Sequence, residues 1–300
     1  EDLWNDNRAN ANIISILQGY SDPRLERWFA TNNADIYSTD DELSPVVEKA
    51  TKYLGVRQGV PMTRTEYQGY SKTSRVGIPE QGPRPVLRVA EAYFLRAEGM
   101  LRNWNMGDGT PESLYNEGIH SAWASVLGDE SGWAGTYESY INGFINTEEG
   151  GDFDWELFEG GFGSAPYINY RNQEYNYYIE ENGKQVGINR ISVRWHDEDS
   201  PEKKLQRIIT QKWISFFPTL SSVAWTEYRR TGYPKLIPIP SDLNYSNGAI
   251  DTELQIRRLP FTQSEYRGNT EEVNKALGLL KGPDNGGTRL WWDVDKGNFE

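Results

Sequence analysis

The chain has 300 residues, of which 37 % are hydrophobic and 25 % charged, so it can bury a sizeable core. Its net charge of -13 would repel phosphate backbones, and no apolar run approaches the roughly 18 residues that a membrane-spanning helix needs. The sequence has no Cys, which excludes disulfides and a Cys nucleophile. We therefore predict a globular chain that neither binds nucleic acid nor crosses a membrane.

The first predicted elements are two antiparallel helices, over residues 86–102 and 111–127. Apolar residues recur at spacings of three and four in both segments, as on one face of a helix. Thr110 and Pro111 give the second helix an N-cap and a favourable first residue. We expect the two helices to pack through Ala90, Ala97 and Trp123, because the small alanines let the neighbouring helix approach closely.

A second pair of helices is predicted over residues 200–230. It begins with the same kind of cap, Ser200 followed by Pro201. Pro218 is expected to separate its two helices, because Pro removes a backbone hydrogen bond. Gly232 is expected to end the pair, since Gly adopts the left-handed backbone of a C-cap without strain.

The remaining segments favour long ordered loops. Gly, Asn and Pro are spread through residues 55–85, 128–190 and 232–300. Residues 233–240 contain three prolines and must be extended, without pairing as a central strand. Long loops in a compact protein usually carry function, so we expect the binding site among them.

Three motifs in this order resemble the RagB/SusD family of bacterial outer-membrane nutrient-binding lipoproteins. The first is the helix at residues 86–98, in which Arg88 precedes two Ala-Glu pairs. The second is similar to the family branch associated with a starch-type transporter, and the third is similar to the closing segment. The second comprises residues 208–214, 224–225 and 229–234, and the third residues 257–261, 264–265, 269, 282–284 and 290–293.

The resemblance implies a mainly α fold, a SusD-like α-helical scaffold with tetratricopeptide-like helix pairs and long ordered loops. It covers what would be the second half of a longer member, from about residue 20 to 293. We therefore expect residues 1–300 to be the C-terminal part of a single SusD-like domain, with any export signal or lipid anchor upstream. The missing half further predicts an exposed apolar patch, formed by Trp4, Ile13, Ile16, Leu17 and Trp28.

The function that the resemblance implies is starch or other carbohydrate binding in nutrient uptake. Such a surface-exposed lipoprotein of the outer membrane binds an oligosaccharide or polysaccharide. It then delivers this ligand to a SusC-like TonB-dependent transporter. The resemblance implies neither a cofactor nor a metal, and it implies no catalytic residue.

Aromatic side chains are the candidate carbohydrate-binding groups, because a sugar ring stacks its apolar face on a flat aromatic ring. Tyr67 and Tyr70 lie in a polar loop before the first helix pair, where few apolar neighbours would bury them. Trp133 and Tyr137 lie in a second Gly-containing loop. The aromatic residues at helical spacing are expected in the core: Trp123, Trp213, Trp225, Tyr93 and Phe94.

Two alternatives remain open. A glycoside hydrolase or lyase could use acidic clusters at residues 152–156 and 197–199, which could also bind calcium. The second cluster, however, is better explained as a solvated helix start. His120 and His196 have no partner at relay or metal-ligand spacing, and no glycine pair forms a phosphate site. The other alternative is a protein-binding helical-repeat scaffold that does not touch sugar.

Overall fold

A computed structural model describes residues 7–20, 22–31, 53, 55, 56, 58, 59, 61, 67, 70, 85–127, 137, 140, 141, 179–181, 184–186, 191–239, 243–293 and 296–300. Within these ranges the helices are α1 (Ala11–Gly19), α2 (Arg24–Trp28), α5 (Val89–Leu101), α6 (Pro111–Leu127), α9 (Pro201–Phe216), α10 (Ser221–Thr231), α11 (Gln263–Gly268) and α12 (Thr270–Leu279). Two short strands, β1 (Ile179–Glu181) and β2 (Lys184–Val186), pair antiparallel. The fold is mainly α, as predicted.

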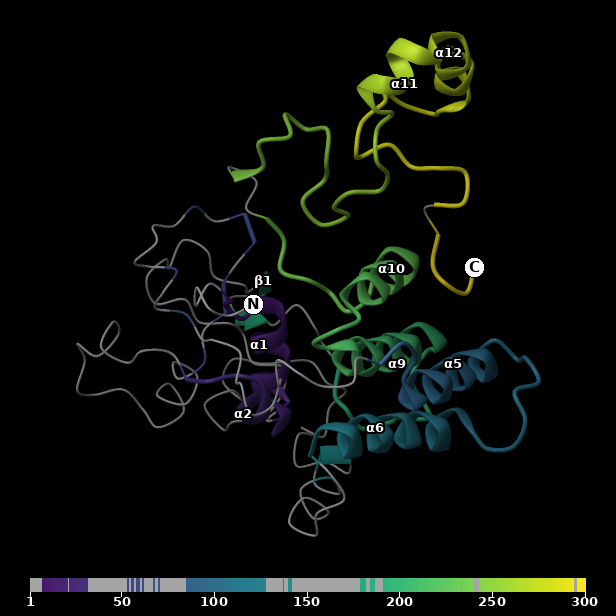
Figure 1. Cartoon of the computed structure of the whole chain (residues 1–300). Helices are drawn as coiled ribbons and strands as arrows, with labels where there is room; N and C mark the ends of the chain where they lie inside the picture. The colour runs from purple at the N-terminus through teal and green to yellow at the C-terminus, as the bar shows by residue number, and fades with distance from the viewer. Residues whose placement is uncertain are drawn as a thin grey trace.

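The first predicted helix pair is confirmed as α5 and α6, which run antiparallel (Figure 1). Thr110 and Ser113 cap α6 reciprocally. The Ser113 N–H donates to Thr110 Oγ1 at 3.0 Å, and the Thr110 N–H donates to Ser113 Oγ at 2.8 Å. The helix α5 begins three residues later than predicted, because Arg88 has an extended backbone and acts as its N-cap.

Close packing of α5 on α6 depends on small residues. Ala90 and Ala97 are buried, as is Trp123 on the facing helix, as predicted. Gly118 of α6 lies directly against the ring of Phe94. A Cβ atom on Gly118 would stand 2.7 Å from Phe94 Cε1, so the glycine allows the two helices to approach.

The second predicted pair is confirmed as α9 and α10, with α9 packed against both α5 and α10 (Figure 1). Ser200 caps α9, since its Oγ accepts from the Lys203 N–H at 3.3 Å. The break between the helices includes Pro218, as predicted. Gly232 ends α10 with φ +76°, and its N–H donates to the Tyr228 carbonyl at 2.7 Å.

The helices α1 and α2 belong to the core. Ile13, Ile16, Leu17 and Trp28 are each at most 3 % exposed and lie in the same hydrophobic cluster as residues of α5, α6 and α9. The predicted apolar patch at residues 1–30 is therefore wrong at these four positions, because the helical core covers them. Trp4 lies outside the described residues.

A buried ion pair anchors the start of α2. Asp22 is 2 % and Arg24 0 % exposed, and Arg24 Nη2 donates to Asp22 Oδ2 at 2.5 Å. The guanidinium also lies over three aromatic rings, with Arg24 Cζ 5.6 Å from the centre of Trp28, 5.5 Å from Trp123 and 5.8 Å from Tyr140. This arginine joins α2, α6 and residue 140 in one cluster.

A second set of buried charges joins α5 to α10. Glu98 is 6 % exposed and accepts two hydrogen bonds from Arg230, each of 2.7 Å. Arg102 donates two more to Glu98 Oε1, at 2.9 and 3.1 Å. Burial opposes ionisation of Glu98, but the hydrogen bonds and charges of Arg230 and Arg102 outweigh burial and lower its pKa.

The C-terminal segment holds α11 and α12, which lie away from the α5, α6 and α9 layer (Figure 1). Two ion pairs tie the segment together, Arg257 with Asp293 and Arg258 with Asp284. Residue Asn298 then returns to the helices, where its side chain donates to Thr231 O at 3.1 Å. None of the helices described is both long and apolar enough to span a membrane.

Candidate functional site

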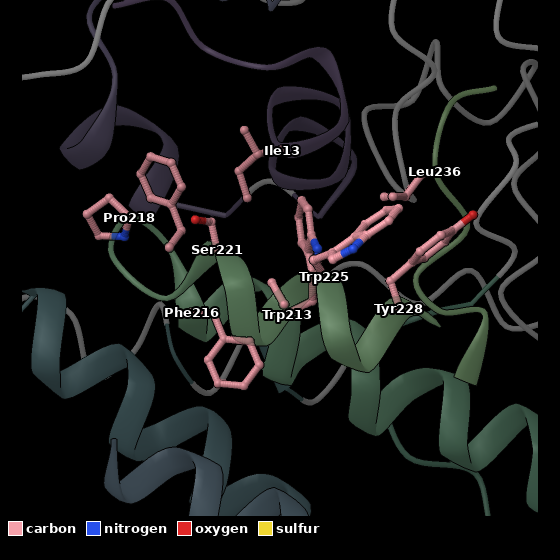
Figure 2. Close-up of a pocket in the computed structure, with 10 residues that line it drawn as sticks. Ile13, Trp213, Phe216, Pro218, Ser221, Trp225, Tyr228 and Leu236 are labelled. Carbon is pink, nitrogen blue, oxygen red and sulfur yellow. The ribbon is translucent and has the colours of Figure 1, made fainter. Parts of the chain in front are cut away.

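An open pocket of about 200 Å³ lies where α1, α9 and α10 meet (Figure 2). In Figure 2 Ile13 reaches it from α1, and Trp225 reaches it from α10. Aromatic and aliphatic side chains form nearly all of the wall. The lining residues are Ile13, Trp213, Phe216, Phe217, Pro218, Ser221, Ala224, Trp225, Tyr228 and Leu236.

The chemistry of this pocket is apolar. The rings of Trp225 and Tyr228 stack with their centres 5.7 Å apart and their planes at 23°. The Tyr228 hydroxyl donates a hydrogen bond to the Glu253 carbonyl at 2.6 Å. Ser221 supplies the one polar side chain apart from the aromatic edges. A sugar seated here would leave most hydroxyls without partners, whereas an apolar side chain would fit.

The aromatic residues predicted to lie in the core differ in burial. Trp123 and Phe94 are buried as expected, at 3 % and 0 % exposure. Trp213 and Trp225 are only half-buried and line the pocket. The pattern of helical spacing found their helix face correctly. It could not show that part of this face borders an open pocket.

Tyr67, the first predicted binding residue, is half-buried and lies beside Arg8. Arg8 Cζ stands 5.5 Å from the centre of the tyrosine ring, and Arg8 Nε donates to the Tyr67 carbonyl at 3.1 Å. A guanidinium beside an aromatic ring can donate hydrogen bonds to the hydroxyls of a sugar that stacks on the ring. No local sequence pattern points to Arg8, because 59 residues separate it from Tyr67.

The other predicted binding residues lie in different surroundings. Tyr70 is 6 % exposed, so the expectation that its polar loop leaves it open is wrong. Tyr137 is half-buried, donates its hydroxyl to the Asn116 carbonyl at 2.9 Å and lies edge-on to Trp123. Trp133 lies outside the described residues.

A serine, a histidine and a glutamate lie in the order of a catalytic relay. His196 Nε2 is 3.4 Å from Ser192 Oγ, and His196 Nδ1 is 3.5 Å from Glu198 Oε1. Ser192, however, is 4 % exposed, and its hydroxyl already contacts the Arg194 carbonyl and Arg207 Nη2. A hydroxyl enclosed in this way cannot reach a polysaccharide.

The general acid of a glycoside hydrolase needs a raised pKa, whereas the carboxyl groups of Asp199 and Asp284 have lowered pKa values. In Asp199 burial opposes ionisation, but Arg207 outweighs it and lowers the pKa. The pKa of Asp284 is lowered in the same way, against burial, by hydrogen bonds that include Arg258. The cluster at residues 152–156 lies outside the described part. Within that part, no group of three or more acidic, His or Cys side chains is placed to hold a metal.

Comparison with known structures finds proteins that have a similar fold. A chitin-binding SusD homologue from Flavobacterium johnsoniae is 36 % identical over 97 % of this chain, with a TM-score of 0.70. SusD homologues from Bacteroides uniformis and Bacteroides vulgatus are 30 % and 31 % identical, with TM-scores of 0.72 and 0.70. This chain covers 50 % of each of the three, so it spans about half their length.

Comparison with curated proteins gives no match. The family model described as SusD-like, SusD and RagB outer membrane lipoprotein, matches residues 1–140 and 162–293. This match covers most of the chain and includes the three motifs of the sequence analysis. The chain therefore belongs to the SusD-like family of SusD and RagB outer-membrane lipoproteins.

Proposed function

We propose that this protein binds oligosaccharide at the outer-membrane surface and delivers it to a SusC-like TonB-dependent transporter. The observation that carries the proposal is the 36 % identity to a chitin-binding SusD homologue over 97 % of the chain. Chitin oligosaccharides are therefore the first ligands to test. Because this chain spans half of that homologue, the rest of the binding site would come from elsewhere in the whole protein.

Tyr67 is the proposed first contact with the sugar. Its ring is half-buried, and the guanidinium of Arg8 lies over it, 5.5 Å from the ring centre. Trp133 remains a proposed contact from the second loop. The proposal for Tyr70 and Tyr137 needs a change of side-chain position on binding, because both now pack against protein.

Calorimetry with chitin hexasaccharide tests the binding. One stacked ring contributes on the order of 1 kcal/mol, so Tyr67→Ala should weaken binding about fivefold to tenfold with little change in melting temperature. Tyr245→Ala is the matched control, because Tyr245 is 77 % exposed in a different segment. Equal affinity in both variants would remove Tyr67 from the site, and no binding by the parent would reject chitin as the ligand.

The hydrolase alternative is tested by incubation with a panel of polysaccharides. We expect no new reducing ends, because Asp199 and Asp284 have lowered pKa values and Ser192 is enclosed. Turnover that survives repeated purification would contradict the binding function. Binding of neither oligosaccharide nor polysaccharide would instead favour the protein-binding scaffold.

Delivery to the transporter is tested in the organism that carries the gene. Deleting the gene should slow uptake of a fluorescent chitin oligosaccharide, and the parent gene should restore it. A Tyr67→Ala gene expressed at the same level should restore uptake only partly. Full uptake after deletion would reject the delivery step while leaving binding intact.

A further inference from the structure

Two adjacent tryptophans of the C-terminal segment are exposed to solvent. Trp291 is 84 % and Trp292 57 % exposed, although a Trp ring is highly buried on average. The residues that precede them, 284–290, are all buried or half-buried. The two rings therefore stand out from a segment that is itself packed. We call this pair of rings the Trp291–Trp292 corner.

The two rings of the Trp291–Trp292 corner are perpendicular. Their centres lie 5.4 Å apart and their planes at 90°, so the edge of one ring meets the face of the other. One ring then forms the floor and the other the wall of a right angle. Each indole also carries an N–H donor at its rim. A ligand that has a flat apolar face and polar groups around its edge suits this arrangement.

The turn that carries the corner is held in place by buried charges. The Asp293 N–H donates to the Leu290 carbonyl at 2.9 Å, which closes the turn. The Asp293 carboxylate accepts from Arg257 Nε at 2.6 Å, and Arg257 Nη2 donates to the Arg229 carbonyl of α10 at 3.3 Å. The side chains of Arg257 and Asp293 are 11 % and 9 % exposed, so solvent screens the pair little. A fixed backbone under both rings lowers the entropy cost of binding a ligand.

The size of the corner favours a sugar over a polypeptide. A Trp side chain offers at most about 250 Å² of surface, so the two exposed fractions leave at most about 350 Å² free. A stable protein interface buries about 800 Å² on each partner, more than twice that area. A pyranose is smaller, and its C–H face stacks on an indole while its hydroxyls accept from N–H donors. Arg289, which lies 3.8 Å from Asp293 Oδ1, adds donors at the base of the turn.

We propose that the Trp291–Trp292 corner is a second contact for neutral glycan, on a different part of the chain from Tyr67. The inference rests on the proposed oligosaccharide binding and extends it to the C-terminal segment. Tyr67 lies beside Arg8 near the N-terminus, whereas the corner is attached to α10 through Arg257. A polysaccharide that reaches both contacts is held at two points, which raises its overall affinity.

Fluorine NMR tests the proposal at the rings themselves. The full chain is labelled with 5-fluorotryptophan, and the variants Trp291→Phe, Trp292→Phe and Trp104→Phe assign three signals. Chitin hexasaccharide should shift the Trp291 and Trp292 signals until they saturate. The Trp104 signal is the matched control and should not shift. Trp104 is 62 % exposed, but within the described part of the chain no second ring lies beside it.

Trp291→Ala measures what the corner contributes to affinity. The hexasaccharide concentration at half-shift, read at the Trp292 signal, should rise about fivefold to tenfold, because one of the two ring surfaces is lost. The melting temperature should not change, since the removed side chain is exposed. Trp104→Ala should leave both quantities as in the parent.

Three outcomes would overturn this second contact. They are calorimetric binding of the hexasaccharide with no shift of the Trp291 or Trp292 signal, an equal shift of the Trp104 signal, and shifts that follow the concentration of the chain without sugar. The first leaves the proposed function intact, and the last would indicate self-association. A parent chain that binds no hexasaccharide by either method would reject the proposed ligand and this contact together.

Discussion

Buried charge is the most sensitive feature of this chain at the scale of single residues. Asp22→Asn keeps the shape of the side chain but leaves the guanidinium of Arg24 without its counter-charge. Because Arg24 is 0 % exposed, we expect a loss of about 3–5 kcal/mol in the free energy of unfolding. Urea denaturation measures it. Asp108→Asn, at an exposed position, should change stability by less than about 0.5 kcal/mol, and equal effects would show that Arg24 finds other partners.

Single residues were also where prediction from sequence was least complete. The polar loop around Tyr67 and Tyr70 suggested two accessible rings, yet Tyr70 is buried. Burial of a loop residue depends on segments that are distant in the sequence, which local polarity does not report. Arg8 is a similar case, because its position beside Tyr67 follows from the fold and from no local pattern.

At the scale of elements, two glycine substitutions in different helices should have opposite effects on stability. Gly118→Ala would place a methyl group 2.7 Å from the Phe94 ring, so we expect a loss of about 1–3 kcal/mol. Gly278→Ala in α12 meets no atom within 4 Å and should stabilise the chain by about 0.5–1 kcal/mol. Thermal melting distinguishes them. A stable Gly118→Ala variant would mean that the helices can separate at little cost.

The contact between α5 and α10 predicts a pH dependence. The pKa of folded Glu98 lies below its usual value of 4.5, so its contribution is present above that pH and is lost as the pH falls through the folded value. Glu98→Gln removes this carboxylate. The free energy of unfolding of the parent should therefore fall more between pH 6 and pH 3 than that of the variant. Parallel pH profiles would contradict the assigned pKa shift.

The helices themselves could be predicted because their signals are local. Thr110, Ser200 and Gly232 mark helix ends by their own backbone and side-chain chemistry, and each cap is present. The pairing of Glu98 with Arg230 could not be predicted, since 132 residues separate the two. The open pocket was missed for the same reason, because three separate segments build it.

At the scale of the whole molecule, the net charge of -13 predicts a preference among glycans. Neutral chitin hexasaccharide should bind more tightly than a polygalacturonate oligosaccharide of equal length at low salt, because the surface field repels anions. The difference should shrink as salt shortens the screening length, from about 30 Å at 0.01 M to about 3 Å at 1 M. Calorimetry at two salt concentrations measures it. Tighter binding of the anionic glycan at low salt would indicate a local basic site.

The Glu98–Arg230 pair also has a consequence for the order of events during synthesis. Ribosomes add roughly 5–20 residues per second, so on the order of 10 s pass between the appearance of Glu98 and that of its partner. Throughout this interval the newly made α5 and α6 carry an acidic side chain that has no Arg230 to pair with. Nascent chains that end before Arg230 therefore lack this contact between α5 and α10, and proteases should cleave them more readily than chains that include it.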